Sequence, residues 1–198
     1  MKKFILTIAV IAAAAMTANA QIGVGAGYLN SSAKTTVGNN SSTAAMNGAY
    51  VGADYTIGLV GGLNVTPGVY YSFLAGEPAN LGPISGQTTE HYVTVPVYLN
   101  YGMDLGAAKV FAYAGPSLQM GLASTSKITV GGTTNTTNNY DNDSYGRMNV
   151  LVGGGIGADI ADMLRLTVGY DFGLLDRNSS DNVSLKTSQL HVGVAYLF

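Results

Sequence analysis

The chain lacks cysteine and tryptophan, and it has few charged residues. Only 10% of its 198 residues are charged, whereas 47% are hydrophobic. The absence of cysteine excludes disulfides and thiolate metal sites. A soluble domain typically carries about 25% charged residues, so this deficit indicates that much of the surface does not face water. The formal net charge of −2 argues against nucleic acid as a partner.

The chain also lacks a long apolar run beyond its first twenty residues. A helix that spans a membrane needs roughly 20 consecutive apolar residues. An apolar surface without such runs is typical of a transmembrane β-barrel, because residues that face lipid alternate with residues that face the lumen.

The amino terminus has the pattern of a secretory signal peptide. Lys2 and Lys3 precede a short apolar stretch, which ends at the small-residue motif Ala18-Asn19-Ala20. We predict that residues 1–20 form a cleaved signal peptide and that residues 21–198 form one barrel domain. Loss of the two lysines lowers the net charge from −2 to about −4.

Eight segments of the mature chain alternate between apolar and small or polar residues, as strands with one apolar face require. They cover residues 22–29, 46–57, 63–74, 90–101, 109–122, 147–160, 164–175 and 187–198. The pattern predicts an all-β fold, an eight-stranded antiparallel transmembrane up-and-down β-barrel.

The connections between these segments alternate in length. Those after the second, fourth and sixth segments are short, whereas those after the first, third and fifth are long and rich in Ser, Thr, Asn and Gly. We predict short periplasmic turns, long outer loops and both termini in the periplasm. Residues 31–43 and 133–139 are interpreted as mobile loops, with adhesive surfaces or sugar attachment as alternatives.

The aromatic residues form three predicted groups. Outward Tyr and Phe fall at both ends of the strands, which predicts two aromatic girdles. The outer girdle comprises Tyr28, Tyr71, Phe73, Tyr170 and Phe172, and the periplasmic girdle Tyr55, Tyr101, Tyr196 and Phe198. The third group faces inward: Tyr50, Tyr70, Tyr98, Phe111 and Tyr113. Because eight strands enclose a lumen that side chains just fill, we predict that it is plugged.

Three charged residues are placed on the lumenal face. Asp159 and Arg165 flank the turn at 161–163 symmetrically and face the same way, and Asp54 falls at a similar depth. Buried charges persist only when paired, so we predict a lumenal ion pair of Asp159 with Arg165 that Asp54 joins. Pro67, Pro96 and Pro116 also fall within strands, where we expect bulges or missing ladder bonds.

The last eight residues carry a further pattern. His191, Gly193, Tyr196 and Phe198 give the order polar-x-Gly-x-x-aromatic-x-aromatic at the carboxyl end. It resembles the assembly signal that outer-membrane β-barrels carry on their last strand, which implies the barrel-assembly machinery as a partner. We predict that this strand closes the barrel by pairing with residues 22–29.

Several segments resemble the PorT-like outer-membrane β-barrel domains. The strand at 109–122 contains Ala114-Gly115-Pro116-Ser117, residues 91–101 hold Pro96 in an apolar strand, and residues 170–174 read Tyr-Asp-Phe-Gly-Leu. More broadly, the chain is similar to the OmpA/OmpX-type eight-stranded barrels. This resemblance implies an outer-membrane location but no particular activity.

Three motifs have a functional and a structural interpretation. His91 or His191 could serve as the base for a Ser nucleophile in a lipid hydrolase, but spacing alone places no acid and Ser beside them. Residues 141–146 resemble the start of a calcium loop but lack its later ligands. The glycine run at 153–157 lacks the strand–turn–helix context of a dinucleotide site. We expect no catalytic, cofactor or metal site.

The sequence therefore predicts a non-enzymatic, monomeric protein of the cell outer membrane. Its plugged barrel would present extracellular loops for structural, adhesive or protective interactions. The expected partners are outer-membrane lipid, the barrel-assembly machinery and an unknown extracellular ligand, and not nucleic acid. The alternatives are a barrel enzyme that acts on lipid, a narrow pore, and a secreted lipocalin-like barrel with its apolar face inward.

Overall fold

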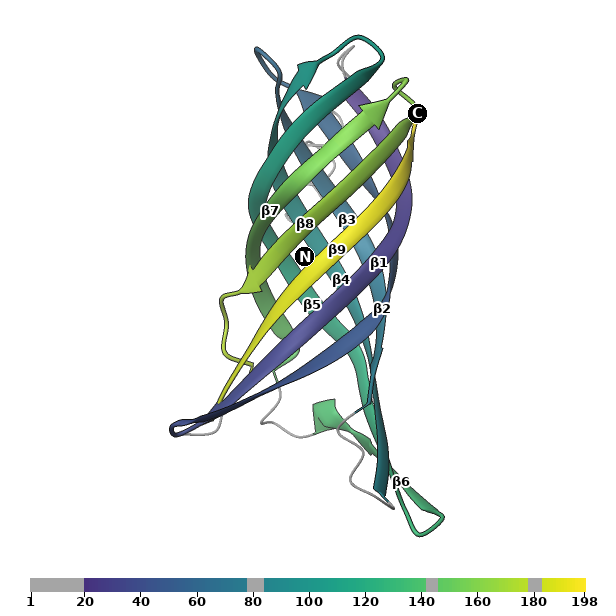
Figure 1. Ribbon diagram of the computed structural model, residues 1–198, viewed down its shortest axis with the longest axis vertical. Coiled ribbons are helices and arrows are strands. Elements are labelled where there is room, and N and C mark those ends of the chain that lie inside the picture. The colour runs from purple at the N-terminus through teal and green to yellow at the C-terminus, as the bar shows by residue number, and fades with distance from the viewer. Residues whose placement is uncertain (1–19, 78–83, 142–145, 178–182) are drawn as a thin grey trace, which may run out of the picture.

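The computed structural model describes residues 20–77, 84–141, 146–177 and 183–198, and it shows a closed barrel of tilted antiparallel strands (Figure 1). The strands are β1 (Ala20–Val37), β2 (Asn40–Gly58), β3 (Leu63–Gly76), β4 (Ile84–Asp104), β5 (Ala108–Val130), β6 (Thr133–Asn138), β7 (Met148–Ile160), β8 (Leu164–Gly173) and β9 (Val183–Leu197). One 3₁₀ turn, η1 (Asn139–Asp141), follows β6. No helix among the described residues is long and apolar enough to cross a membrane.

Eight of these strands form the barrel wall. The short strand β6 lies outside this ring and pairs with the end of β5. The sheet runs β4-β3-β2-β1-β9-β8-β7-β5-β6, and pairing of β4 with β5 closes the ring. The predicted contact between the first and last strands is confirmed, because Gly23 pairs with Leu197 and Leu29 with His191. The predicted signal peptide lies outside the described residues, except for Ala20 at the start of β1.

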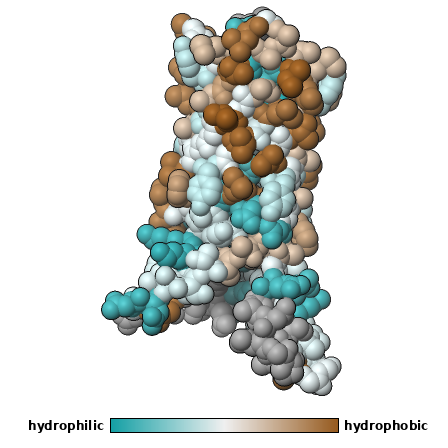
Figure 2. All heavy atoms as spheres, in the orientation of Figure 1, coloured by the Kyte–Doolittle hydropathy of each residue, from teal (hydrophilic) through white to brown (hydrophobic). Residues whose placement is uncertain are grey.

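The two faces of the wall differ as the alternation predicts. On β2, Val51 is 52% exposed and projects outward, whereas Asp54 is 9% exposed and faces the lumen. Figure 2 shows hydrophobic residues over much of the barrel surface and hydrophilic residues toward the end with the long hairpins. Because the apolar face is outward, the lipocalin-like alternative is wrong.

Both predicted aromatic girdles lie on the outer surface. Tyr71 and Phe73 are each 41% exposed near the extracellular end, and Tyr101 is 59% exposed near the other end. Tyr170 packs on Phe172, and Tyr196 on Phe198, each pair with ring centroids 4.8 Å apart. Amphipathic rings favour the interface between hydrocarbon and water, so the two girdles mark the limits of the membrane band.

The long connections differ most from the prediction. Residues 31–43 were expected to be a mobile loop, but β1 and β2 continue as a paired hairpin to a turn at Gly38. Residues 133–139 were also expected to be a loop, yet Thr133–Asn138 form β6, which pairs with the extension of β5. Polar β-branched residues are compatible with strands that are exposed on both faces. Such strands show no apolar alternation, so the periodicity did not reveal them.

The prolines interrupt the ladders without changing their register. Beside Pro67, Pro96 and Pro116, the β2–β3, β3–β4 and β4–β5 ladders each skip two residue pairs and then resume. The expected missing ladder bonds are therefore confirmed, because proline donates no backbone hydrogen bond. The bulge lies elsewhere, where the register of β4 against β5 shifts between His91 and Tyr92.

Candidate functional site: the barrel lumen

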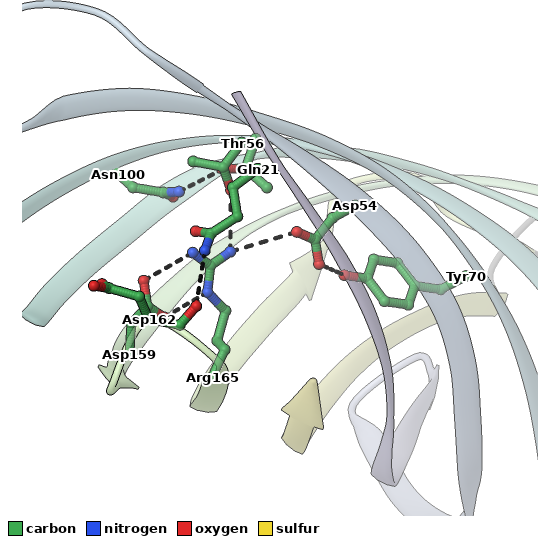
Figure 3. A network of polar contacts seen from close by, with 9 residues as sticks. Gln21, Asp54, Thr56, Tyr70, Asn100, Asp159, Asp162 and Arg165 are labelled. Carbon is green, nitrogen blue, oxygen red and sulfur yellow. Dashed lines mark hydrogen bonds and ion pairs between the residues drawn. The ribbon is translucent and has the colours of Figure 1, made fainter. Parts of the chain in front are cut away.

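A charged cluster fills the periplasmic end of the lumen (Figure 3). Arg165 on β8 binds Asp159 on β7 with two parallel hydrogen bonds, Nε to Oδ1 at 2.7 Å and Nη2 to Oδ2 at 2.9 Å. Its Nη1 reaches across the barrel to Asp54 Oδ1 at 3.4 Å and to Thr56 Oγ1 at 3.1 Å. The Tyr70 hydroxyl donates to the other oxygen of Asp54 at 2.6 Å. The structure therefore brings together all three predicted lumenal charges.

This charged cluster is buried and anchored from several sides. Asp159 is 4% exposed and Arg165 is 7% exposed, and the guanidinium carbon lies 5.2 Å from the centre of the Phe111 ring. The register pairs Asp159 directly with Arg165 across the β7–β8 turn. The single positive charge of Arg165 thus offsets part of the negative charge of both Asp159 and Asp54. Its contact with Asp159 is the stronger of the two, because it is bidentate.

A layer of aromatic side chains lies beside the charged cluster in the lumen. The five inward aromatic residues predicted from the sequence all line one lumenal cavity of about 110 Å³. Tyr50 meets Tyr70 edge-on with ring centroids 5.6 Å apart, and Tyr98 lies 5.0 Å from Tyr113. Because each water molecule takes up roughly 30 Å³, this cavity has room for only a few.

A second polar cluster faces this cavity. His191 Nε2 lies 2.9 Å from the Tyr113 hydroxyl, and His191 Nδ1 lies 3.4 Å from Asp171 Oδ2. The wall has room for them because Gly169 carries no side chain: an added Cβ would lie 2.3 Å from the Tyr113 hydroxyl and 2.5 Å from His191 Nε2. The β8–β9 register brings Asp171 and His191 together, because Asp171 pairs with Gln189 and His191 with Gly169 on neighbouring positions.

A third cluster, at the extracellular end, was missed from the sequence. Arg177 is 2% exposed; its Nη1 donates to the Tyr92 hydroxyl at 3.0 Å and its Nε to the Gly146 carbonyl at 3.2 Å. The Tyr92 hydroxyl in turn donates to Glu90 Oε2. Arg177 also reaches the Tyr140 hydroxyl at 3.4 Å, and burial raises the pKa of this phenol. Arg177 lies between the predicted strands at 164–175 and 187–198. In that connection no alternation of apolar and polar residues indicates which way a side chain points.

Among the described residues, neither histidine is hydrogen-bonded to a serine. His91 lies on the outer surface, where its ring packs 5.1 Å from Phe73 and its Nδ1 is 2.5 Å from the Tyr71 hydroxyl. His191 lies in the lumen against a tyrosine and an aspartate. Among the described residues, no group of three or more His, Cys, Asp and Glu is placed to hold a metal ion. Most of the calcium-like motif, residues 142–145, lies outside the described residues.

The residues of the predicted assembly signal lie on both faces of the carboxyl-terminal segment, three of them in β9 and Phe198 directly after it. Tyr196 is 47% exposed and Phe198 is 72% exposed at the periplasmic girdle. Gly193 faces inward, where an added Cβ would lie 2.0 Å from the Tyr50 hydroxyl. The glycine therefore has a packing role in the barrel, and recognition by the assembly machinery stays a prediction.

Comparison with known proteins identifies the family. Residues 11–177 match the outer membrane protein beta-barrel domain, and the chain belongs to this family of proteins of the cell outer membrane. No curated protein has a significantly similar sequence.

Solved structures of small outer-membrane barrels are similar to the chain. The attachment invasion locus protein Ail of Yersinia pestis is 15% identical; the match covers 90% of this chain and 98% of Ail, with a TM-score of 0.48. OprG of Pseudomonas aeruginosa is 10% identical, with 90% and 95% covered and a TM-score of 0.48. The outer membrane enzyme PagL is 13% identical, with 83% and 97% covered and a TM-score of 0.44.

Proposed function

We propose that this protein is a non-enzymatic, closed barrel that holds two rigid β-sheet projections outside the cell for binding extended segments of extracellular proteins. Within its family we place it among the PorT-like members, because of the strand motif in residues 109–122. Outer-membrane lipid surrounds the apolar face, and the monomer is the functional unit. The observation that carries this proposal is an edge on each projection that has no strand partner in the described part of the chain.

The filled lumen supports a closed barrel that lacks enzymatic activity. Buried arginines hold polar clusters at both ends, and the cavity between them measures about 110 Å³. Small-molecule sites usually occupy roughly 300–1,000 Å³, so the space is too small for a lipid substrate. A conducting pore would need a continuous water path through the Arg165 and Arg177 clusters.

The first projection consists of the extracellular ends of β9, β1 and β2. β1 pairs with β9 on one side and with β2 on the other as far as Val37. The β2–β3 ladder begins only at Asn47, so among the described residues Asn40–Met46 pair with β1 alone. Among the described residues, the outer edge of β2 thus has no strand partner over these seven residues. Both projections extend beyond the barrel end in Figure 1.

The second projection consists of the ends of β4 and β5 together with β6. Within the described chain, Thr133–Asn138 pair only with β5, which leaves the far edge of β6 open. Natural proteins usually protect open edges with charge, proline or a bulge. Neither Asn40–Met46 nor Thr133–Asn138 contains a charged residue or a proline. Such edges suit the addition of an extended strand, in which main-chain hydrogen bonds supply the affinity.

Shortening the first projection should weaken binding at the β2 edge without unfolding the barrel. Residues 33–44 are replaced by Asn-Gly between Ser32 and Ala45, which pair across the hairpin, because this dipeptide forms a tight hairpin turn. Protein in lipid nanodiscs is tested by biolayer interferometry against a panel of purified serum and matrix proteins. We expect at least a tenfold loss of affinity for partners that add a strand to the β2 edge, whereas partners that add to the β6 edge should bind as before.

Two controls isolate the edge as the cause. The shortened protein should still migrate differently on gels with and without boiling, because the barrel is unchanged. Lys34→Ala in the full-length hairpin removes an exposed charge and leaves the backbone edge in place, so it should bind normally. Equal binding of every partner by the shortened and full-length proteins would contradict a binding role for the β2 edge, and no binding by the full-length protein across the panel would contradict the proposal.

A further inference from the structure

We infer that the outward face of the first projection binds phosphate groups of the glycolipid in the outer leaflet of the outer membrane, through the adjacent lysines Lys34 and Lys186. The inference concerns the face of this sheet, whereas the function proposed above depends on its edge, so each can fail without the other. Three observations carry it: a pair of like charges, the position of this pair beyond the aromatic girdle, and the lean of the projection.

The two lysines are direct cross-strand neighbours, Lys34 on β1 and Lys186 on β9. Both side chains are exposed, and alternation along the strands from the exposed Tyr28 and Leu190 places them on the outward face. Like charges directly opposite each other destabilise a sheet. No ion pair in the described part of the chain involves either lysine. An anion bound between the two ammonium groups would offset their repulsion.

The surroundings of the lysine pair supply neutral hydrogen-bond donors. The adjacent cross-strand pairs on the same face consist of hydroxyl residues, Ser32 with Ser188 and Thr36 with Ser184. Asp176 approaches this end of β9, where its Oδ1 accepts a hydrogen bond from the Leu185 amide at 2.8 Å. Lysine and hydroxyl groups both donate to phosphate oxygens. Two positive charges flanked by hydroxyl groups therefore favour a phosphate as the ligand.

The lysine pair lies just beyond the outer aromatic girdle. Tyr170 of this girdle pairs with Leu190, and Lys186 lies four positions farther out on β9. At about 3.3 Å for each residue and a strand tilt of roughly 40°, the Lys186 backbone is about 10 Å farther from the membrane centre than Tyr170. A long lysine side chain can place its ammonium group at the level of lipid headgroups. The pair is thus within reach of phosphates at the membrane surface.

The first projection leans away from the barrel. In Figure 1 the ends of β1 and β2 extend sideways beyond the wall, at the lower left of the picture. When a barrel wall flares outward, its outer face turns toward the surrounding membrane. The outer leaflet of the outer membrane contains phosphorylated glycolipid, and basic residues close to an anionic membrane surface are attracted to it. This charge complementarity favours lipid phosphate over a soluble anion as the ligand.

Lys127 on the second projection provides a matched control. It is also exposed, but its cross-strand neighbours are Gln87 and Thr136, so no second ammonium group lies directly opposite it. A lone lysine contributes only diffuse attraction to an anionic surface, whereas the lysine pair forms a site. Lys127→Gln removes the same charge as Lys34→Gln and leaves the pair intact.

The site is tested by titrating the refolded mature protein, in zwitterionic detergent micelles, with diphosphoryl lipid A. Microscale thermophoresis measures the affinity. We expect Lys34→Gln and Lys186→Gln each to weaken binding about fivefold and the double variant to weaken it at least tenfold. Lys127→Gln should change it by less than about twofold, and the double substitution of the pair by arginine should preserve it. Rising NaCl should weaken binding by the unsubstituted protein, because salt screens exposed charges.

A footprint on the unsubstituted protein tests the site without any substitution. Diphosphoryl lipid A should protect Lys34 and Lys186 from acetylation by an activated ester, as measured by mass spectrometry, and should leave Lys127 reactive. Undiminished binding by the double glutamine variant would overturn the inference, as would an equal loss with Lys127→Gln or a footprint without protection. Loss of binding to dextran sulfate alone, with lipid A binding unchanged, would assign the lysine pair to a soluble polyanion and would also overturn it.

Discussion

Arg165→Ala is expected to destabilise the barrel by about 3–5 kcal/mol, because it leaves two buried carboxylates without their cation. Asp159 would lose both of its bidentate hydrogen bonds, and Asp54 its contact across the barrel. Both carboxylates are less than a tenth exposed, so little solvent reaches them in the intact barrel. Urea unfolding in lipid vesicles, followed by the loss of the fast-migrating folded form on gels, measures the change.

Companion variants separate the loss of charge compensation from the loss of side-chain volume. Arg165→Met keeps much of the volume and should be nearly as unstable as Arg165→Ala. Adding Asp159→Asn to Arg165→Ala should restore part of the stability, because one unpaired charge is removed. Lys186→Ala, at an exposed position, is the matched control and should change stability by less than about 0.5 kcal/mol. A similarly small effect for Arg165→Ala would show that the cluster does not stabilise the fold.

Gly169→Ala is expected to cost about 1–3 kcal/mol through overpacking of the lumen. The new methyl group would lie 2.3 Å from the Tyr113 hydroxyl and 2.5 Å from His191 Nε2. Neither ring can withdraw easily, because Tyr113 also packs on Tyr98 and His191 lies against Asp171. The same urea titration gives the free energy of unfolding, and the His191 ring resonances in an NMR spectrum report the displacement.

The same substitution at Gly146 provides a control. Its added Cβ would meet Arg177 only at ordinary contact distances of 3.5 Å or more, so Gly146→Ala should be tolerated. If Gly169→Ala were as stable as the unsubstituted protein, with unchanged His191 resonances, the close packing of Tyr113 and His191 in the lumen would be refuted.

The membrane-facing part of the fold could be predicted because lipid imposes a strict pattern. Apolar residues must alternate with lumenal ones, so Val51 and Asp54 reveal their directions in the sequence itself. The pairing of Asp159 with Arg165 could also be predicted, because a short turn fixes the register on either side of it. The symmetric placement of Asp159 and Arg165 about this turn also predicts the β7–β8 hairpin, whose turn holds Ala161 and Asp162 at positive φ.

The rest could not be predicted because it depends on contacts between distant segments. Residues such as Thr35 and Thr43 lie in strands that are solvated on both faces, where composition looks like that of a loop. Arg177 enters the lumen from an irregular segment after β8, and its partner Tyr92 is 85 residues away in the chain. The meeting of Asp171 with His191 required the register of β8 against β9, which no short turn in the sequence determined.

A planar-bilayer recording tests the central claim, a barrel closed at both ends by buried polar clusters, most directly. The refolded protein is reconstituted, and flotation of the same vesicles confirms that it has inserted. The account predicts a silent membrane over a wide voltage range, because Arg165 and Arg177 anchor side chains across the lumen. Reproducible unitary conductance steps from the unsubstituted protein would contradict it and would establish a pore in place of a closed scaffold.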